Sequence, residues 1–108
     1  MKVTAGACGF TTRIKAVREE KLCARIEIET DCESVEELKT ILEAGGPIEM
    51  KEFIGTAKKG NKILQLAFET LPHSACPVAV GIIKTLEVEL GLNVPKPVLI
   101  EFEPDSED

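Results

Sequence analysis

The fold of this chain is decided by residues 22–30, which read Leu22-Cys23-Ala24-Arg25-Ile26-Glu27-Ile28-Glu29-Thr30. Apolar side chains alternate there with charged ones, the pattern of a strand with one buried face and one face in water. Leu22, Ala24, Ile26 and Ile28 are predicted to point into the core. Cys23 falls on the opposite, polar face, where we interpret it as incidental to function.

The preceding residues predict two more strands of the same sheet. Residues 11–19 alternate in the same way, with Thr12, Ile14 and Ala16 on one side. Residues 1–5 read as a shorter strand, and the polar residues 18–21 read as a hairpin loop. Three consecutive strands with short connections predict an antiparallel meander.

The following residues switch to helical patterns. A capping box beginning at Ser34 and an apolar stripe predict a helix that ends before Gly45-Gly46. Pro47 is predicted to open a short second helix, and residues 62–71 and 78–90 form the third and fourth. Residues 98–102 are predicted to form a last strand. The expected fold class is α+β: a two-layer sandwich of an antiparallel β-meander plus a C-terminal strand, with the helices on one face.

Length and composition predict one domain over residues 1–103, followed by an acidic tail at residues 104–108. The chain has 108 residues, 44% of them hydrophobic, a net charge of −6 and a pI near 4.9, and this acidity argues against nucleic acid as a partner. No apolar run reaches the roughly 20 residues of a membrane span, and no signal peptide precedes the first strand. We therefore expect a cytoplasmic protein with reduced cysteines and no membrane partner. The oligomeric state is left open.

Chemistry is concentrated at three connections between predicted elements. Cys8 lies in a glycine turn after the first strand, and Cys32 lies between the third strand and a helix. His73 and Cys76 precede the longest helix, and Pro77 suits the first turn of that helix. Thiolates and an imidazole are ligands that suit Zn²⁺ or an iron–sulfur cluster. Helix N-termini after Cys32 and Cys76 would favour the ionised thiols.

Each of these residues also has a simpler interpretation. A free cysteine is commonly a small buried hydrophobic residue, and no Cys-x-x-Cys motif occurs in the sequence. His73 is a candidate ligand, a candidate base for Cys76, or a loop histidine bonded to a nearby carbonyl. Spacing and composition leave these alternatives open.

The same motifs resemble the iron–sulfur cluster assembly scaffolds of the IscU/NifU type. Ala7-Cys8-Gly9 is similar to the family's Ala-Cys-Gly turn, Cys32 to its second cysteine, and residues 71–76 to its Leu-Pro-Pro segment followed by His-Cys. Phe10 stands where that family has an aspartate. The resemblance covers roughly residues 1–91 and implies a SufE/NifU-like fold. The sequence also resembles an uncharacterised cysteine-rich family of anaerobic bacteria and archaea with Cys-Gly-Phe-Thr-Thr and His-x-x-Cys-Pro signatures.

The leading hypothesis is a non-enzymatic protein of scaffold or carrier type that binds a metal, such as zinc, or an iron–sulfur cluster. Cys8, Cys32 and Cys76 would supply thiolates and His73 a fourth or alternate ligand. Partner proteins would be those of sulfur or cluster transfer. A second hypothesis is a thiol enzyme or sulfur carrier, with Cys76 as the reactive group and His73 as its base. A third is an interaction domain whose cysteines only pack.

Overall fold

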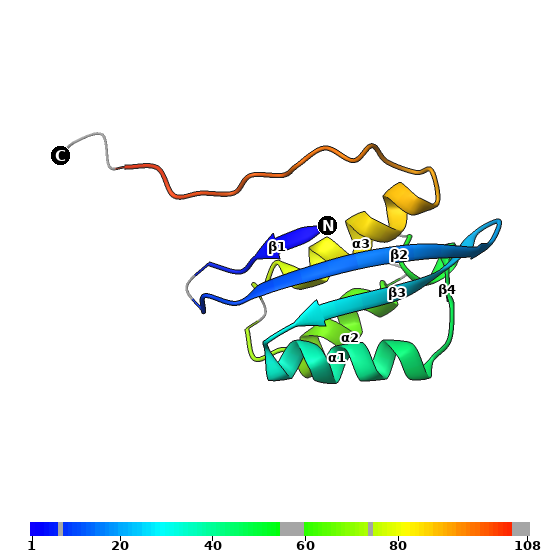
Figure 1. Ribbon diagram of the computed structural model, residues 1–108, viewed down its shortest axis with the longest axis horizontal. Coiled ribbons are helices and arrows are strands. Elements are labelled where there is room, and N and C mark those ends of the chain that lie inside the picture. Colours follow the sequence, from blue (N-terminus) through cyan, green and yellow to red (C-terminus); the bar gives the residue numbers. More distant parts are fainter. Residues whose placement is uncertain (7, 55–59, 74, 105–108) are drawn as a thin grey trace.

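Four strands form one antiparallel sheet in the order of the chain. They are β1 (Lys2–Thr4), β2 (Thr11–Glu20), β3 (Cys23–Thr30) and β4 (Ile48–Glu49) (Figure 1). The structure, a computed structural model, describes residues 1–6, 8–54, 60–73 and 75–104. The predicted meander is therefore confirmed, with a short fourth strand added to it.

The long hairpin of β2 and β3 forms the centre of the sheet. Thr12 lies opposite Thr30, Ile14 opposite Ile28 and Ala16 opposite Ile26. Thr12, Ile14, Ala16 and their apolar neighbours on β3 are buried, while the residues between them face outward. The period of two along each strand thus places one face of the sheet in the core and leaves the other in water.

Three helices cover the buried face. They are α1 (Glu33–Ala44), α2 (Lys62–Thr70) and α3 (Val78–Glu89). Helix α1 packs against β3, α3 packs against β1, β2 and β3, and α2 packs against the other two helices. Two layers therefore enclose one core, which confirms the α+β class and the helices on one face. None of the helices in the described residues is long and apolar enough to cross a membrane.

The seating of α3 fixes its direction relative to the sheet. Gly81 lies so close to β1 and β2 that a Cβ atom there would stand 2.7 Å from Val3 Cγ2 and 3.2 Å from Ile14 Cδ1. Eight residues later, the Glu89 carboxylate accepts a hydrogen bond from the Arg18 backbone N–H at 3.1 Å. Helix α3 therefore runs in the same direction as β2, and its N-terminus lies at the Thr11 end of that strand.

The structure differs from the sequence-based expectations in four segments. Leu22, which was predicted to point into the core, lies in the β2–β3 turn and is 46% exposed, because β3 begins only at Cys23. Helix α1 begins at Glu33, with Cys32 rather than Ser34 as its N-cap. The segment after Pro47 forms β4 and a 3₁₀ turn, η1 (Met50–Glu52), because pairing with Cys23 and Ala24 extends it.

The predicted C-terminal strand was wrong. Residues 92–104 lie outside the layers without regular structure, although their apolar side chains favour a strand. A strand requires a neighbouring edge, and no edge of this chain pairs with the segment in the described residues. Of the predicted acidic tail at 104–108, residues 105–108 lie outside the described residues.

Candidate functional site

Three connections that carry cysteines lie at the same end of the sheet. Thr4 pairs with Thr11, and Thr12 pairs with Thr30, so the β1–β2 turn and the end of β3 share one end. The direction of α3 brings the α2–α3 connection there as well, at the left of Figure 1. We call this region, with Cys8, Cys32, His73 and Cys76, the cysteine end.

Cys8 lies in the tight turn between β1 and β2. The Gly9 N–H donates to the Gly6 carbonyl at 2.9 Å, and both glycines have positive φ angles, +83° for Gly6 and +77° for Gly9. Residues other than glycine rarely adopt that backbone conformation, so the turn depends on these two glycines. The Cys8 side chain is exposed, and its thiol is accessible from solvent.

Cys32 is held by a chain of hydroxyl groups. Its backbone N–H donates to Thr30 Oγ1 at 3.2 Å, and Thr30 Oγ1 lies 2.8 Å from Thr12 Oγ1. Among the residues that the structure describes, Thr12 is the buried polar one, with 1% of its surface exposed. No role was predicted for the pair of Thr12 and Thr30. Thr12 alternates with the apolar residues Ile14 and Ala16 along β2, and a threonine at such a core-facing position could have indicated a buried hydroxyl group.

Cys76 and His73 occupy one turn before α3. The Cys76 N–H donates to the His73 carbonyl at 3.1 Å. Cys76 is half-buried against the edge of the core, as Cys32 is, whereas the His73 ring is exposed. Pro77 is the N-cap of α3, and its carbonyl accepts the Gly81 N–H at 2.9 Å.

The cysteine end gathers these residues in one region but not around one point. Within the described ranges, which include all four cysteines and His73, no three or more His, Cys, Asp and Glu side chains lie close enough to hold a metal ion. The types of donor fit a soft metal, whereas their arrangement does not form a closed coordination shell. The metal site therefore stays a prediction.

Cys23 lies at the opposite end of the sheet. It begins β3, pairs with Glu49 and lies beside the β2–β3 turn. Burial raises the pKa of its thiol, and the nearby carboxylates of Glu20 and Glu49 raise it further. These surroundings disfavour the thiolate, which agrees with the interpretation of Cys23 as incidental. All four cysteines are free thiols.

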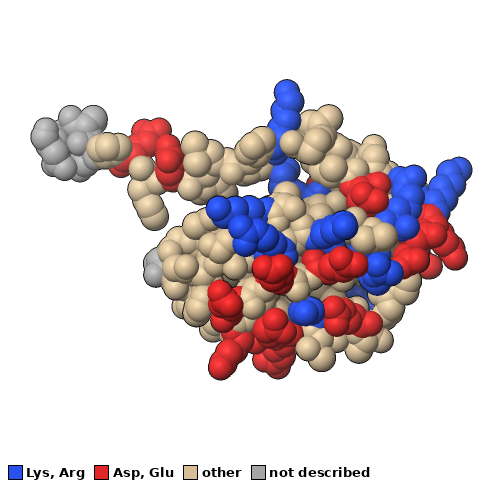
Figure 2. All heavy atoms as spheres, viewed as in Figure 1, with Lys and Arg blue, Asp and Glu red and all other residues tan. Residues whose placement is uncertain are grey.

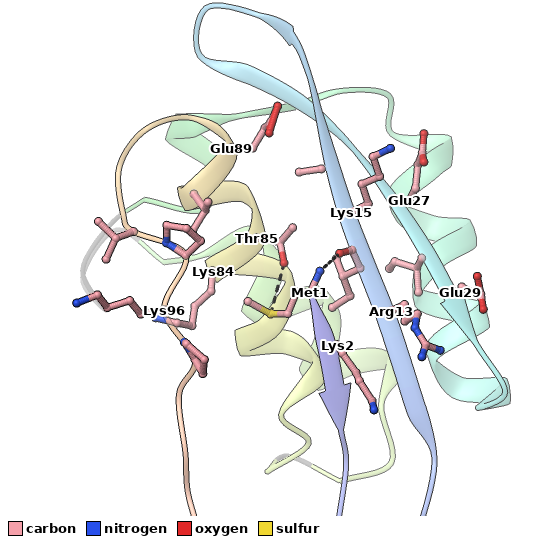
Figure 3. Close-up of a pocket in the computed structure, with 17 residues that line it drawn as sticks. Met1, Lys2, Arg13, Lys15, Glu27, Glu29, Lys84, Thr85, Glu89 and Lys96 are labelled. Atoms are coloured by element: carbon pink, nitrogen blue, oxygen red, sulfur yellow. Dashed lines mark hydrogen bonds between the residues drawn. The ribbon is translucent and has the colours of Figure 1, made fainter.

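A groove that the sequence analysis did not predict runs beside β2, away from the cysteines. It has a volume of about 960 Å³ and lies between the edge of β2, α3 and residues 94–97 (Figure 3). Five basic side chains line it (Lys2, Arg13, Lys15, Lys84 and Lys96), along with three glutamates (Glu27, Glu29 and Glu89). Residues from five separate segments form it, which is why local sequence patterns did not reveal it.

The sequence matches one family model over nearly its whole length. Residues 1–102 match the Family of unknown function (DUF6951), and the chain belongs to that family. No curated protein matches the chain. No solved structure matches it either.

The resemblance to the IscU/NifU-type scaffolds was therefore wrong. The family match is to DUF6951, and no match to the scaffolds accompanies it. The motifs that carried the resemblance are short: one triplet, one single cysteine and the six residues 71–76, in which His73 and Cys76 are not adjacent. Ala7, in the first of those motifs, and Ser74, in the third, lie outside the described residues.

Proposed function

We propose that this protein binds a thiophilic metal ion or an iron–sulfur cluster at the cysteine end and acts as a carrier. Cys8, Cys32 and Cys76 supply thiolates, and His73 supplies an imidazole. Such a carrier works with partner proteins of sulfur or cluster transfer. Reduced thiols are required, so the proposal includes a cytoplasmic location.

One observation supports the proposal above the others. Three cysteines separated by 24 and 44 positions in the chain lie at one end of the sheet, at three separate connections. Cys32 is the N-cap of α1, and Cys76 lies next to Pro77, the N-cap of α3; dipoles at helix N-termini stabilise negative charge. Ligands on connections can approach one another without disturbing the core, whereas ligands within strands cannot.

The open arrangement favours a carrier over a permanent structural site. A structural zinc site has four ligands already in place at about 2.0–2.3 Å from the metal. Here the exposed Cys8 turn and the exposed His73 would close on ligands already fixed at Cys32 and Cys76. Binding that requires closure costs free energy, which lowers affinity and eases release.

The test is metal binding by protein prepared without oxygen. The full chain is incubated with Zn²⁺, or with iron and sulfide, desalted, and analysed for metal content and for sulfur-to-metal absorption. We expect bound metal in the unmodified protein and a loss of at least about half of it in Cys32→Ser, because removing one of four ligands weakens the site.

The chain contains its own matched control. Cys23→Ser removes a thiol from the other end of the sheet and should leave metal content unchanged. Equal losses in Cys32→Ser and Cys23→Ser, or no metal in any of the proteins after reconstitution, would contradict the proposal. In the second case, chelator-insensitive alkylation of Cys76 that depends on His73 would favour the thiol-enzyme alternative instead.

A further inference from the structure

The C-terminal segment carries large apolar side chains that nothing in the described structure covers. Leu99, Ile100 and Phe102 are 77%, 87% and 104% exposed. Figure 2 shows this segment extending away from the body of the molecule. Several large apolar side chains exposed close together are characteristic of an interaction site.

An open sheet edge lies beside the point where this segment leaves the body. The β1 strand pairs with β2 from Thr11 to Arg13, and the Met1 backbone continues that pairing to Ile14. Beyond Ile14, no described strand covers this side of β2. The register turns the N–H and C=O groups of Ala16 and Arg18 toward the open side. Of these groups, the Arg18 N–H is held by the Glu89 carboxylate.

The groove and the segment have complementary chemistry. The groove next to this edge has an apolar floor and more basic than acidic side chains on its rim, although the whole chain has a net charge of −6. Glu27 and Glu89, two of its three carboxylates, already have partners, in Arg25 and in the Arg18 N–H. The segment has the opposite charge: its apolar residues Val98, Leu99, Ile100 and Phe102 are accompanied by two acidic ones, Glu101 and Glu103.

We propose that residues 98–103 of one copy bind as an added strand along residues 15–20 of β2 in a second copy. Side chains of a strand alternate between two faces, so Val98, Ile100 and Phe102 enter the groove on the side of α3, where Lys84 lies. Glu101 and Glu103 lie on the other face with Leu99, and this is the face of β2 from which Lys15 projects (Figure 3). Six residues of strand span about 20 Å, and the segment and the open edge match in length. The segment that favours a strand thus finds its neighbouring edge in another molecule.

In a dimer with two-fold symmetry, the C-terminal segments of both copies are bound at the same time. Pro97 itself lines the groove, so the segment leaves each body beside its own binding groove. When two grooves face each other, each segment crosses to the other copy over a short distance, and the exchange closes as a dimer. Pro95 and Pro97 lack backbone N–H groups, which keeps the connecting residues themselves from pairing with β2.

The first test is the oligomeric state of the full chain over a range of concentrations, measured by sedimentation or light scattering. We expect a dimer whose dissociation constant rises at least about tenfold in Phe102→Asp, because a large apolar side chain would be replaced by a charge. Phe68→Asp is the matched control: Phe68 is 59% exposed on α2, and the same substitution there should leave dimerisation unchanged. Lys84→Glu on the groove should weaken the dimer, whereas Lys39→Glu on α1 should not.

A mixing experiment shows whether the contact is between copies. A chain ending at Pro97 keeps every core residue, because the last of them is Leu90, and it retains the groove without the segment. Lys84→Glu retains the segment with a damaged groove. Each should be mostly monomeric alone, and together they should form a heterodimer.

Three results would overturn the proposal. One is a monomer at every concentration. Another is a dimer that is equally stable in Phe102→Asp. The third is a monomer whose Ala16 amide is protected from hydrogen exchange, with protection lost in the chain that ends at Pro97, which would show binding within one molecule.

Discussion

At one end of the sheet, Cys8, Cys32 and Cys76 lie on connections, and Cys32 and Cys76 lie near the N-termini of α1 and α3. At the other end, Cys23 begins a strand opposite Glu49 and near Glu20, and burial and these carboxylates raise the pKa of its thiol. The same residue type therefore has different chemistry at the two ends. Position relative to helix termini and carboxylates, more than the presence of a thiol, decides whether a cysteine is suited to ligation.

The largest effect is expected from disturbing α3, because its seating brings Cys76 to the cysteine end. Gly81→Val would place a branched side chain where even a Cβ atom is 2.7 Å from Val3 Cγ2. We expect the free energy of unfolding to fall by about 1–3 kcal/mol, the usual cost of overpacking a core. Urea denaturation measures this change.

Gln65→Val is the matched control for Gly81→Val. It introduces the same side chain at an exposed position of α2 and should cost only the few tenths of a kcal/mol of a lower helix propensity. Equal stability of Gly81→Val and the unmodified protein would show that α3 is not seated on β1 and β2. The cysteine end would then lose one of its three connections.

A smaller effect is expected in the reactivity of the thiols at the two ends. Alkylation of the unfolded and the folded chain by iodoacetamide at pH 8, followed by peptide mass spectrometry, gives a rate for each cysteine. Cys23 should react several-fold more slowly than the exposed Cys8 in the folded protein, because its thiol is partly buried and its pKa is raised.

Glu20→Gln sharpens this prediction. It removes the nearby charge that contributes most to the raised pKa after burial, and so it should speed the alkylation of Cys23 without affecting Cys8. The prediction would be contradicted if Cys23 reacted as fast as Cys8, or if Glu20→Gln left the alkylation rate of Cys23 unchanged. The two ends of the sheet would then not differ in the electrostatics of their thiols.

The smallest effect concerns Glu52, which ties η1 to α2. Its carboxylate accepts the Glu49 N–H at 2.7 Å and lies 2.9 Å from Lys62 Nζ. Partial burial raises the pKa of Glu52, but the hydrogen bonds from Glu49 and Lys62 outweigh burial, and the net pKa is lowered. A lowered pKa in the folded state means that ionised Glu52 stabilises the fold.

Glu52→Gln should therefore lower stability by less than about 1 kcal/mol at pH 7. The difference should be constant above the unfolded pKa of a glutamate, near 4.3, and should shrink as the pH falls through the lower folded pKa. Urea denaturation at pH 7 and below pH 4 measures it, with Glu37→Gln on the exposed face of α1 as the control for loss of one charge. A difference that grows as the pH falls would contradict the assigned direction.

Strong periodic patterns predicted the strands and helices well. The alternation in residues 11–19 and 22–30 corresponds to β2 and β3, and the patterns at 62–71 and 78–90 correspond to α2 and α3. The start of α1 was missed by two residues. Ser34 and Cys32 are both able to precede a helix, and the hydroxyl groups of Thr12 and Thr30 hold the backbone at Cys32.

Predictions from local sequence patterns failed where a segment's structure depends on the segment that it pairs with. β4 exists because it pairs with β3, and residues 98–102 remain outside the layers because no described strand pairs with them. Strand propensity reports how well side chains suit a sheet, and it does not report whether an edge is available.

The sequence by itself determined the two-layer plan, because alternation with a period of two and stripes with a period of 3.6 specify which faces must be buried. It also determined which residues carry soft ligands and which cysteine falls on the polar face of a strand. Only the tertiary structure decided that Cys8, Cys32 and Cys76 share one end of the sheet. It also formed the basic groove beside an open edge of β2. Those relations arise from α3 lying along β2, with its Gly81 against Val3 and Ile14, and such contacts between distant segments have no local signature in the chain.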